Sequence, residues 1–172
     1  MLLPVFIIEW MIESYCDPPP SVGDEVSWRL AFDEHDEAPH PLRRGSVRLA
    51  CSASPFTWPG QTLNPYAVHL ECGGVHLYWD SRHPQSGPLV VEGYVYADYD
   101  GYTPDDFPTT RGIVRGVEVE ECDYNRDVDG GVEVYTLAKT QPRYRAVTTS
   151  PKWFRTPDLT AETGIVVTLE TS

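Results

Sequence analysis

The segment Tyr66–Trp79 constrains the fold of this chain more than any other. Apolar and polar residues alternate on both sides of Gly73-Gly74, which is the pattern of a β-hairpin closed by a two-residue turn. That turn length places Glu71 opposite His76, and residues that oppose each other share a face. One face then carries Val68, Leu70, Cys72, Val75, Leu77 and Trp79, whereas the other carries His69, Glu71, His76, Tyr78 and Asp80. We expect the first face to join the core and the second to meet water or a ligand.

A second hairpin is predicted between Arg111 and Thr140, with Asp129-Gly130 as the two-residue turn that a type I′ geometry prefers. The register that follows pairs Arg126 with Glu133, Tyr124 with Tyr135, Cys122 with Leu137, and Glu120 with Lys139. The adjacent acids Glu120-Glu121 interrupt the alternation of the strand, so we expect a β-bulge nearby.

Five further segments have the residue content of strands: Val26–Phe32, Gly45–Cys51, Leu89–Tyr99, Arg143–Thr149 and Gly164–Thr171. The apolar N-terminus Met1–Ile12 is interpreted as a buried first strand, and residues 157–163 as one short helix. Many short strands without a long amphipathic helix predict an all-β protein. Glycines and the expected bulge favour an antiparallel small β-barrel with at most one short helix, the alternative being a β-sandwich. We expect residues 1–172 to form a single β domain.

The chain is strongly acidic, with a formal net charge of -13 from 26 acidic and 13 basic residues. Phosphate recognition needs Lys and Arg, so this charge argues against nucleic-acid binding and against an anionic membrane surface. An acidic surface suits a protein that is simply soluble, or one that docks on a basic protein partner. The leading hypothesis is therefore a small acidic soluble protein-interaction module, such as an adaptor, an inhibitor or an immunity-type protein. The oligomeric state is left open.

The four cysteines, Cys16, Cys51, Cys72 and Cys122, are far apart and form no CxxC pair. We therefore expect reduced, mostly buried thiols and no disulfide. The apolar N-terminus lacks a basic segment and is interrupted by Glu9, so it is typical neither of a secretory signal nor of a membrane span. These features favour the cytoplasm.

The polar face of the first hairpin offers a candidate metal site at His69, Glu71 and His76. His76 opposes Glu71 and lies diagonal to His69, and two imidazoles with one carboxylate can hold Fe(II), Mn(II) or Zn(II). The alternative is a solvated strand face with a Glu71–His76 cross-strand pair. A metal-binding or metal-dependent β-barrel is the second functional hypothesis.

The turn of the second hairpin matches the first half of a calcium loop. Asn125, Asp127 and Asp129 are followed by Gly130, and Glu133 stands at the ninth position. Against calcium, the twelfth position is Thr136 and no helices are expected beside the loop. The hairpin explains Asp129-Gly130 equally well, so both interpretations stay open.

A third candidate site is the segment that interleaves aromatic and acidic residues: Tyr96, Asp98, Tyr99, Asp100, Tyr102, Asp105, Asp106 and Phe107. Such a segment can bind sugars or grip a basic protein, because Tyr supplies large contact area at low entropic cost. The alternative is an exposed, mobile loop. A carbohydrate-binding β domain is therefore the third hypothesis.

No GxSxG pattern, Cys–His pair or Gly-rich phosphate loop occurs with the context that catalysis needs. The sequence therefore favours a protein without catalytic residues and without a resident cofactor, unless it binds a divalent metal. Arg111-Gly112 and Arg115-Gly116 place isolated glycines in a strand, which indicates bulges or close backbone approach.

The two ends and one middle strand resemble a family of actinobacterial proteins of unknown function. The resemblance is carried by Trp10, Cys16 with the prolines after it, Val22–Trp28, Gly112–Arg115, Val117–Val119 and Glu162–Glu170. Members of that family often have two cysteines and a glycine after the first Trp, whereas this chain has Tyr15-Cys16-Asp17. The resemblance supports a barrel of strands and turns and implies no activity.

Overall fold

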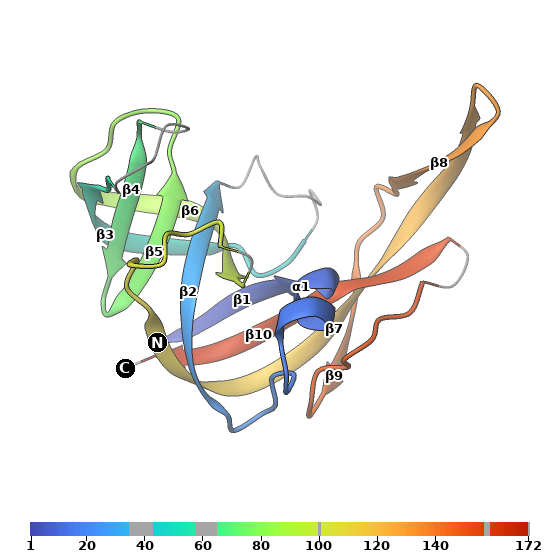
Figure 1. Cartoon of the computed structure of the whole chain (residues 1–172), viewed down its shortest axis with the longest axis horizontal. Helices are drawn as coiled ribbons and strands as arrows, with labels where there is room; N and C mark the ends of the chain where they lie inside the picture. The colour runs from blue at the N-terminus through green and yellow to red at the C-terminus, as the bar shows by residue number, and fades with distance from the viewer. Residues whose placement is uncertain (35–42, 58–64, 100, 157–158, 172) are drawn as a thin grey trace.

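The computed structural model describes residues 1–34, 43–57, 65–99, 101–156 and 159–171, and most of these residues are in β-strands (Figure 1). The elements are β1 (Leu2–Ile8), α1 (Glu9–Tyr15), β2 (Glu25–Glu34), β3 (Val47–Pro55), β4 (Ala67–Cys72), β5 (Val75–Asp80), β6 (Gly87–Asp98), β7 (Thr110–Asp129), β8 (Val132–Leu137), β9 (Arg143–Val147) and β10 (Thr160–Thr171). The prediction of a mostly β fold with one short helix is confirmed for the described residues.

The strand pairings close into two rings. Neighbouring strands follow the order β10-β1-β6-β3-β4-β5-β2-β7-β8, with β9 beside β7, and two further pairings join β10 to β7 and β6 to β2. The first ring is therefore β10-β1-β6-β2-β7, and the second is β6-β3-β4-β5-β2. Both rings share the β2–β6 pair, and most pairs are antiparallel; β1–β6 and β2–β5 are short parallel contacts.

The first hairpin has the predicted register. Glu71 pairs with His76 and Cys72 with Val75, around a turn in which Gly73 and Gly74 both have positive φ. The predicted core face is buried throughout, since Val68, Leu70, Cys72, Val75, Leu77 and Trp79 are all at most 5% exposed. Alternation along the two strands was therefore sufficient to sort their side chains.

The second hairpin has a register that differs from the prediction by two residues. The turn is Gly130-Gly131, so Val128 pairs with Glu133 and Arg126 with Tyr135. A type I′ turn needs positive φ at both central residues, and two glycines adopt it without the strain that Asp129 would incur. A shift of two residues keeps every side chain on its predicted face, and Arg126 still forms an ion pair with Glu133.

This hairpin projects from the rest of the molecule as a two-stranded arm (Figure 1). We define the arm as Tyr124–Leu137. Over this range its two strands pair with each other, and β7 continues from there into the main sheet. Nearly every residue of β8 is exposed. The base of the arm lies next to β10, since Asp123 pairs with Thr160, and the candidate site is found there.

The helix lies elsewhere than predicted. β1 ends at Ile8 and α1 follows at once, so the prediction of a strand continuing to Ile12 is wrong. Lys152 Nζ donates hydrogen bonds to the carbonyl oxygens of Ile12 (3.0 Å) and Cys16 (2.8 Å), which satisfies acceptors at the end of the helix. In the described part of the chain no helix is long and apolar enough to span a membrane.

The predicted helix over residues 157–163 is wrong from Thr160 onward, where the chain belongs to β10 and pairs with β7. Residues 157–158 lie outside the described residues. The predicted bulge is confirmed: Glu162 pairs with Glu121 and Gly164 with Glu120, so Thr163 is the extra residue, on β10.

The prediction that all four cysteines are reduced is wrong. Cys51 and Cys72 form a disulfide between the adjacent strands β3 and β4, 21 residues apart in sequence. Both side chains point to the core, so their pairing depends on the register of two strands that the sequence did not show to be neighbours. Cys16 and Cys122 are free and buried, as predicted.

Candidate functional site

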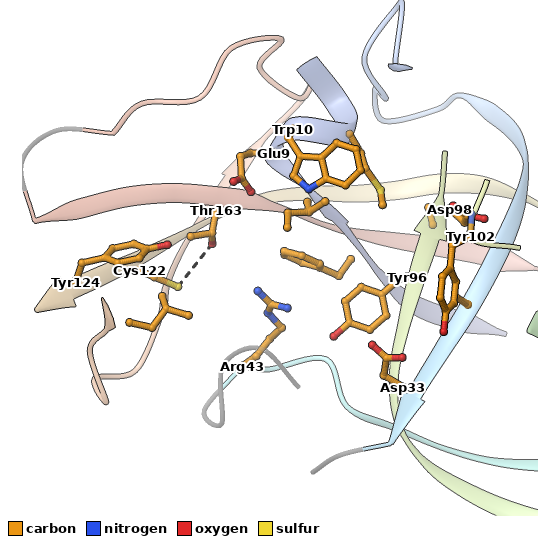
Figure 2. Close-up of a pocket in the computed structure, with 16 residues that line it drawn as sticks. Glu9, Trp10, Asp33, Arg43, Tyr96, Asp98, Tyr102, Cys122, Tyr124 and Thr163 are labelled. Carbon is orange, nitrogen blue, oxygen red and sulfur yellow. Dashed lines mark hydrogen bonds between the residues drawn. The ribbon is translucent and has the colours of Figure 1, made fainter. Parts of the chain in front are cut away.

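A pocket of about 450 Å³ lies on the outer face of the first ring, between α1, β2, β6 and the base of the arm (Figure 2). Strand alternation puts it there: Leu3, Val5 and Ile7 of β1 point into the core, whereas Phe6 points the other way and lines the pocket. In β2, Ala31 and Asp33 line the pocket in the same way. The arm contributes Tyr124 and Leu137 to the wall, and β10 contributes Thr163.

Arg43 and Glu120 form a buried ion pair at this wall. Arg43 Nη2 lies 2.6 Å from Glu120 Oε1 and Arg43 Nε lies 3.0 Å from Oε2, a two-pronged arrangement. The guanidinium also lies over the ring of Phe6, 3.6 Å from its centre. Tyr144 and Thr163 each donate a further hydrogen bond to Glu120, both at 2.8 Å. The carboxylate is therefore well supplied with donors.

Burial and ion pairing have opposite effects on the pKa values of these two groups. Burial alone would raise the pKa of Glu120, but the hydrogen bonds and positive charge of Arg43 outweigh it and hold that pKa below its usual value. Burial disfavours the Arg43 cation, yet Glu120 raises the pKa of Arg43 overall. Both groups are charged, and their charges offset each other.

Two polar atoms beside the pair have no partner at hydrogen-bond distance among the described residues, although the Arg43 and Tyr96 side chains interact with each other. Among the described residues, the buried side-chain atoms without such a partner are Arg43 Nη1, the Tyr96 hydroxyl and Trp79 Nε1, and the first two belong to pocket-lining side chains. Figure 2 shows the Arg43 guanidinium between Cys122 and Tyr96 in this view. Burial raises the pKa of Tyr96 to about 12, although the charge of Arg43 lowers it. The phenol is therefore neutral at physiological pH.

Carboxylates line the rest of the pocket. Glu9, Asp33 and Asp98 come from three different elements. Burial raises the pKa of Glu9, and the nearby charge of Glu13 adds to that effect. Asp98 is buried and accepts hydrogen bonds from the backbone N–H groups of Tyr102 and Thr103. Since Glu120 offsets Arg43, the described residues that line the pocket carry a net negative charge.

The third candidate segment contributes to this pocket in part. Tyr96, Asp98 and Tyr102 line it, and Asp100 lies outside the described residues. The others lie elsewhere: Tyr99 packs edge-on against Trp28, Asp105 pairs with Arg29, Asp106 is exposed and Phe107 is buried. The alternative of an exposed loop is therefore wrong for Asp98 and Phe107.

Phe107 covers part of the polar face of the first hairpin. Its ring packs edge-on against Tyr78, Phe56 and His69, and Tyr78 is fully enclosed as a result. The expectation that this face meets water is thus wrong at Tyr78, because a loop distant in sequence folds over it.

The structure brings two of the three residues of the predicted His69, Glu71 and His76 site into contact. His69 Nε2 and His76 Nδ1 are 3.0 Å apart, within hydrogen-bond distance. Glu71 is opposite His76 on the neighbouring strand and exposed. Within the described ranges, no three His, Cys, Asp or Glu side chains gather as a metal-ion site would require.

The four residues of the predicted calcium loop are divided between the two faces of the arm. Asn125, Asp127 and Asp129 lie on one face, since they alternate along β7. Glu133 pairs with Val128 and so lies on the other face, where it binds Arg126 and the hydroxyl of Tyr135. The hairpin therefore does not bring these oxygen ligands together.

The sequence interpretation missed Arg43, Glu120 and the α1 residues Glu9 and Trp10 as site residues. One signal was present: an acid at position 120 interrupts a buried strand, and a buried acid needs a cation or several donors. Arg43 lies 77 residues away and after a loop, so no local pattern could identify it as that cation.

Fold and pocket together define a mostly β protein with an acidic, aromatic-lined pocket built around a buried ion pair. The chain belongs to a family of unknown function, DUF6578, which matches residues 1–171. The resemblance to a family of unknown function is thereby confirmed, over nearly the whole chain. No curated protein and no solved structure matches it.

Proposed function

We propose that this protein binds a small molecule in the pocket between α1, β6 and the base of the arm. The observation that carries the proposal is the pair of unpartnered polar atoms, Arg43 Nη1 and the Tyr96 hydroxyl, on pocket-lining side chains. A buried polar group without a partner costs about 1–3 kcal/mol, and a ligand with a hydrogen-bond acceptor would remove that cost. The volume of about 450 Å³ is in the range of small-molecule sites.

The chemistry of the wall supports binding and not group transfer. Cys122 lines the pocket, but burial raises the pKa of its thiol to about 11, so it is protonated at neutral pH and a poor nucleophile. Arg43 and Glu120 are committed to each other. The remaining groups are suited to holding a molecule by stacking, hydrogen bonds and charge.

Nile red, a neutral dye that fluoresces in apolar surroundings, provides the test. We expect the dye to bind the wild-type protein and to lose that binding in Ala31→Leu, because Ala31 lines the pocket and a larger side chain fills it. Ala146→Leu is the matched control, since Ala146 is exposed on β9 away from the pocket. Met11→Trp fills the pocket from α1 and replaces Ala31→Leu if that variant fails to fold. Equal dye binding by the filled and control variants would remove the proposal.

A second function, interaction with a basic protein, is favoured by the arm. Val128 and Val132 near its tip are 62% and 66% exposed, and an isolated two-stranded hairpin is only marginally stable in water. A net charge of -13 selects a basic partner over an acidic one. We therefore propose that a basic protein covers the arm, as an adaptor, inhibitor or immunity-type protein would require.

The arm is tested with a purified basic partner isolated from the protein's own host. Val128→Thr with Val132→Thr should weaken binding at least about tenfold, and binding should fall steeply with salt. Val90→Thr is the control, because Val90 on β6 is also exposed, at 55%. Binding that is indifferent to ionic strength, or that survives the arm double variant, would contradict this proposal.

We infer that the first ring is a small barrel, supported by its closed pairing and by the buried Leu3, Val5 and Ile7 inside it.

The sequence favoured the cytoplasm as the compartment of this protein. The Cys51–Cys72 disulfide favours an oxidising compartment instead.

A further inference from the structure

We propose that the ligand of this pocket is a small organic cation that also carries a hydrogen-bond acceptor, such as an aliphatic ammonium compound with an aromatic ring and a carbonyl group. The inference rests on the proposed function and names the chemical class that the pocket selects. Three features of the wall support it: its charge, its aromatic rings and its unpartnered donor.

The charge of the wall favours a cation. Among the described residues, the carboxylates of Glu9, Asp33 and Asp98 line the pocket, and the guanidinium of Arg43, which also lines it, is paired with Glu120. Burial destabilises the Glu9 carboxylate and raises its pKa, and the nearby positive charge of Arg43 offsets this only in part. A positive ligand beside Glu9 would recover that energy, while an anionic ligand would face like charges at short range.

The aromatic rings of the wall suit the same class. Trp10, Tyr96, Tyr102 and Tyr124 all line the pocket (Figure 2). Aromatic faces attract organic ammonium groups, and the attraction grows when water is excluded. The face of Phe6 already carries the Arg43 guanidinium at 3.6 Å, so this wall shows the interaction once within the protein itself.

The unpartnered donor defines the other end of the ligand. The Arg43 side chain is 4% exposed, its Nε and Nη2 are bonded to Glu120, and its Nη1 has no acceptor. A carbonyl or ether oxygen on the ligand could take that hydrogen bond. The Tyr96 hydroxyl can donate to the same oxygen or accept from the ligand's amine. A cation without any acceptor would leave Nη1 unsatisfied.

Three tryptophan derivatives that differ chiefly in charge test the proposal by displacing Nile red at a pH just below neutral. Tryptophanamide is a cation with a carbonyl, N-acetyltryptophanamide is its neutral counterpart, and N-acetyltryptophan is an anion. We expect tryptophanamide to displace the dye at a concentration at least about tenfold lower than the neutral compound, and the anion to be weakest, because one favourable ion pair is worth roughly a factor of ten.

Isosteric variants show which carboxylate causes the preference for the cation over the neutral compound. Glu9→Gln should reduce the advantage of the cation over the neutral compound to about threefold or less, because it removes one carboxylate and keeps the shape. Glu13→Gln is the matched control on the same helix, since Glu13 does not line the pocket and its oxygen can still accept from the N–H of Phe154.

The outcomes separate this proposal from the proposed function. Equal displacement by the three compounds, strongest displacement by the anion, or displacement by none of them would overturn the assignment of a cation. So would a preference that Glu9→Gln and Glu13→Gln change to the same extent. None of these results affects pocket binding itself, which depends on the dye and on Ala31→Leu.

Discussion

Arg43 and Glu120 are 77 residues apart in sequence and form an ion pair that is closed to solvent, with side chains 4% and 0% exposed. The pair joins the segment before β3 to the middle of β7, next to the bulge at Thr163. Removing one member of a buried pair leaves the other charge without compensation, which costs far more than the pair itself contributes.

Glu120→Gln is therefore expected to lower the free energy of unfolding by about 3–5 kcal/mol, measured by urea denaturation. Arg43→Met should have a similar effect. The double variant Arg43→Met/Glu120→Leu should lose much less than the sum of the two single changes, because no charge remains buried. Additive losses in this cycle would show that the two charges do not stabilise each other.

The His69–His76 contact predicts a pH dependence near neutrality. Burial lowers the pKa of His69, and His76 lowers it further, against a smaller opposing effect of Glu71. The unfolded chain therefore binds a proton at His69 more readily than the folded protein does. The contribution to stability is complete above the ordinary His pKa of about 6.5 and declines as the pH falls below it.

His69→Gln should flatten this decline, which we expect to be less than about 1 kcal/mol because His69 is only partly buried and solvent screens its charge. Thermal unfolding between about pH 5 and 7.5 measures it. His83→Gln is the control, since His83 is exposed. An identical pH profile for the wild type and His69→Gln would assign the decline to other groups.

The Cys51–Cys72 disulfide should add about 3 kcal/mol to the free energy of unfolding, the value expected for a closed loop of this length. Thiol titration of the unfolded, unreduced protein should count two free thiols, those of Cys16 and Cys122. After reduction the count should be four, and the urea midpoint should fall. Four thiols before reduction would exclude the disulfide.

Two glycines of β7 form a matched pair. A Cβ at Gly112 would lie 2.7 Å from the backbone oxygen of Glu170 and 2.8 Å from Leu169, too close for any real contact. A Cβ at Gly116 would meet nothing nearer than Thr168, at 3.5 Å. Gly112→Ala should therefore destabilise the protein by about 2 kcal/mol or more, because the strands must move apart.

Gly116→Ala should be neutral or slightly stabilising, since alanine loses less backbone entropy on folding. Chemical denaturation of the two variants in parallel tests the difference. Equal stability would mean that β10 yields to a methyl group at Gly112. The isolated glycines at these positions predicted bulges or close backbone approach. The structure shows close approach at Gly112 and a bulge beside Gly116, where Arg115 is the extra residue of β7.

Local patterns predicted the parts of the fold that local chemistry determines. The register of the first hairpin follows from Gly73-Gly74 and the alternation beside it. The second hairpin offered two overlapping turns in Asp129-Gly130-Gly131, and only the conformational demand at both central positions distinguishes them. Sequence alternation could not resolve that choice, since both registers place every side chain on the same face.

The candidate site depends on contacts that no local pattern contains. Tyr96, Asp98 and Tyr102 were singled out from composition. Arg43 and Glu9, which line the same pocket, come from distant parts of the chain. The disulfide was missed for the same reason, because strand neighbours are set by topology and not by spacing. Only the acid at position 120, which interrupts a buried strand, indicated a contact with a distant segment.

β7 runs without a break from the first ring, past Cys122 and Tyr124 at the pocket, to the tip of the arm. In mechanical terms the arm is a cantilever: it is clamped by β10 at its base and free at its tip (Figure 1). A force that bends the free end produces its largest torque at the base of the arm. Tyr124 and Leu137 form the pocket wall at this base. A load on the tip and an occupant of the pocket therefore act on the same few residues.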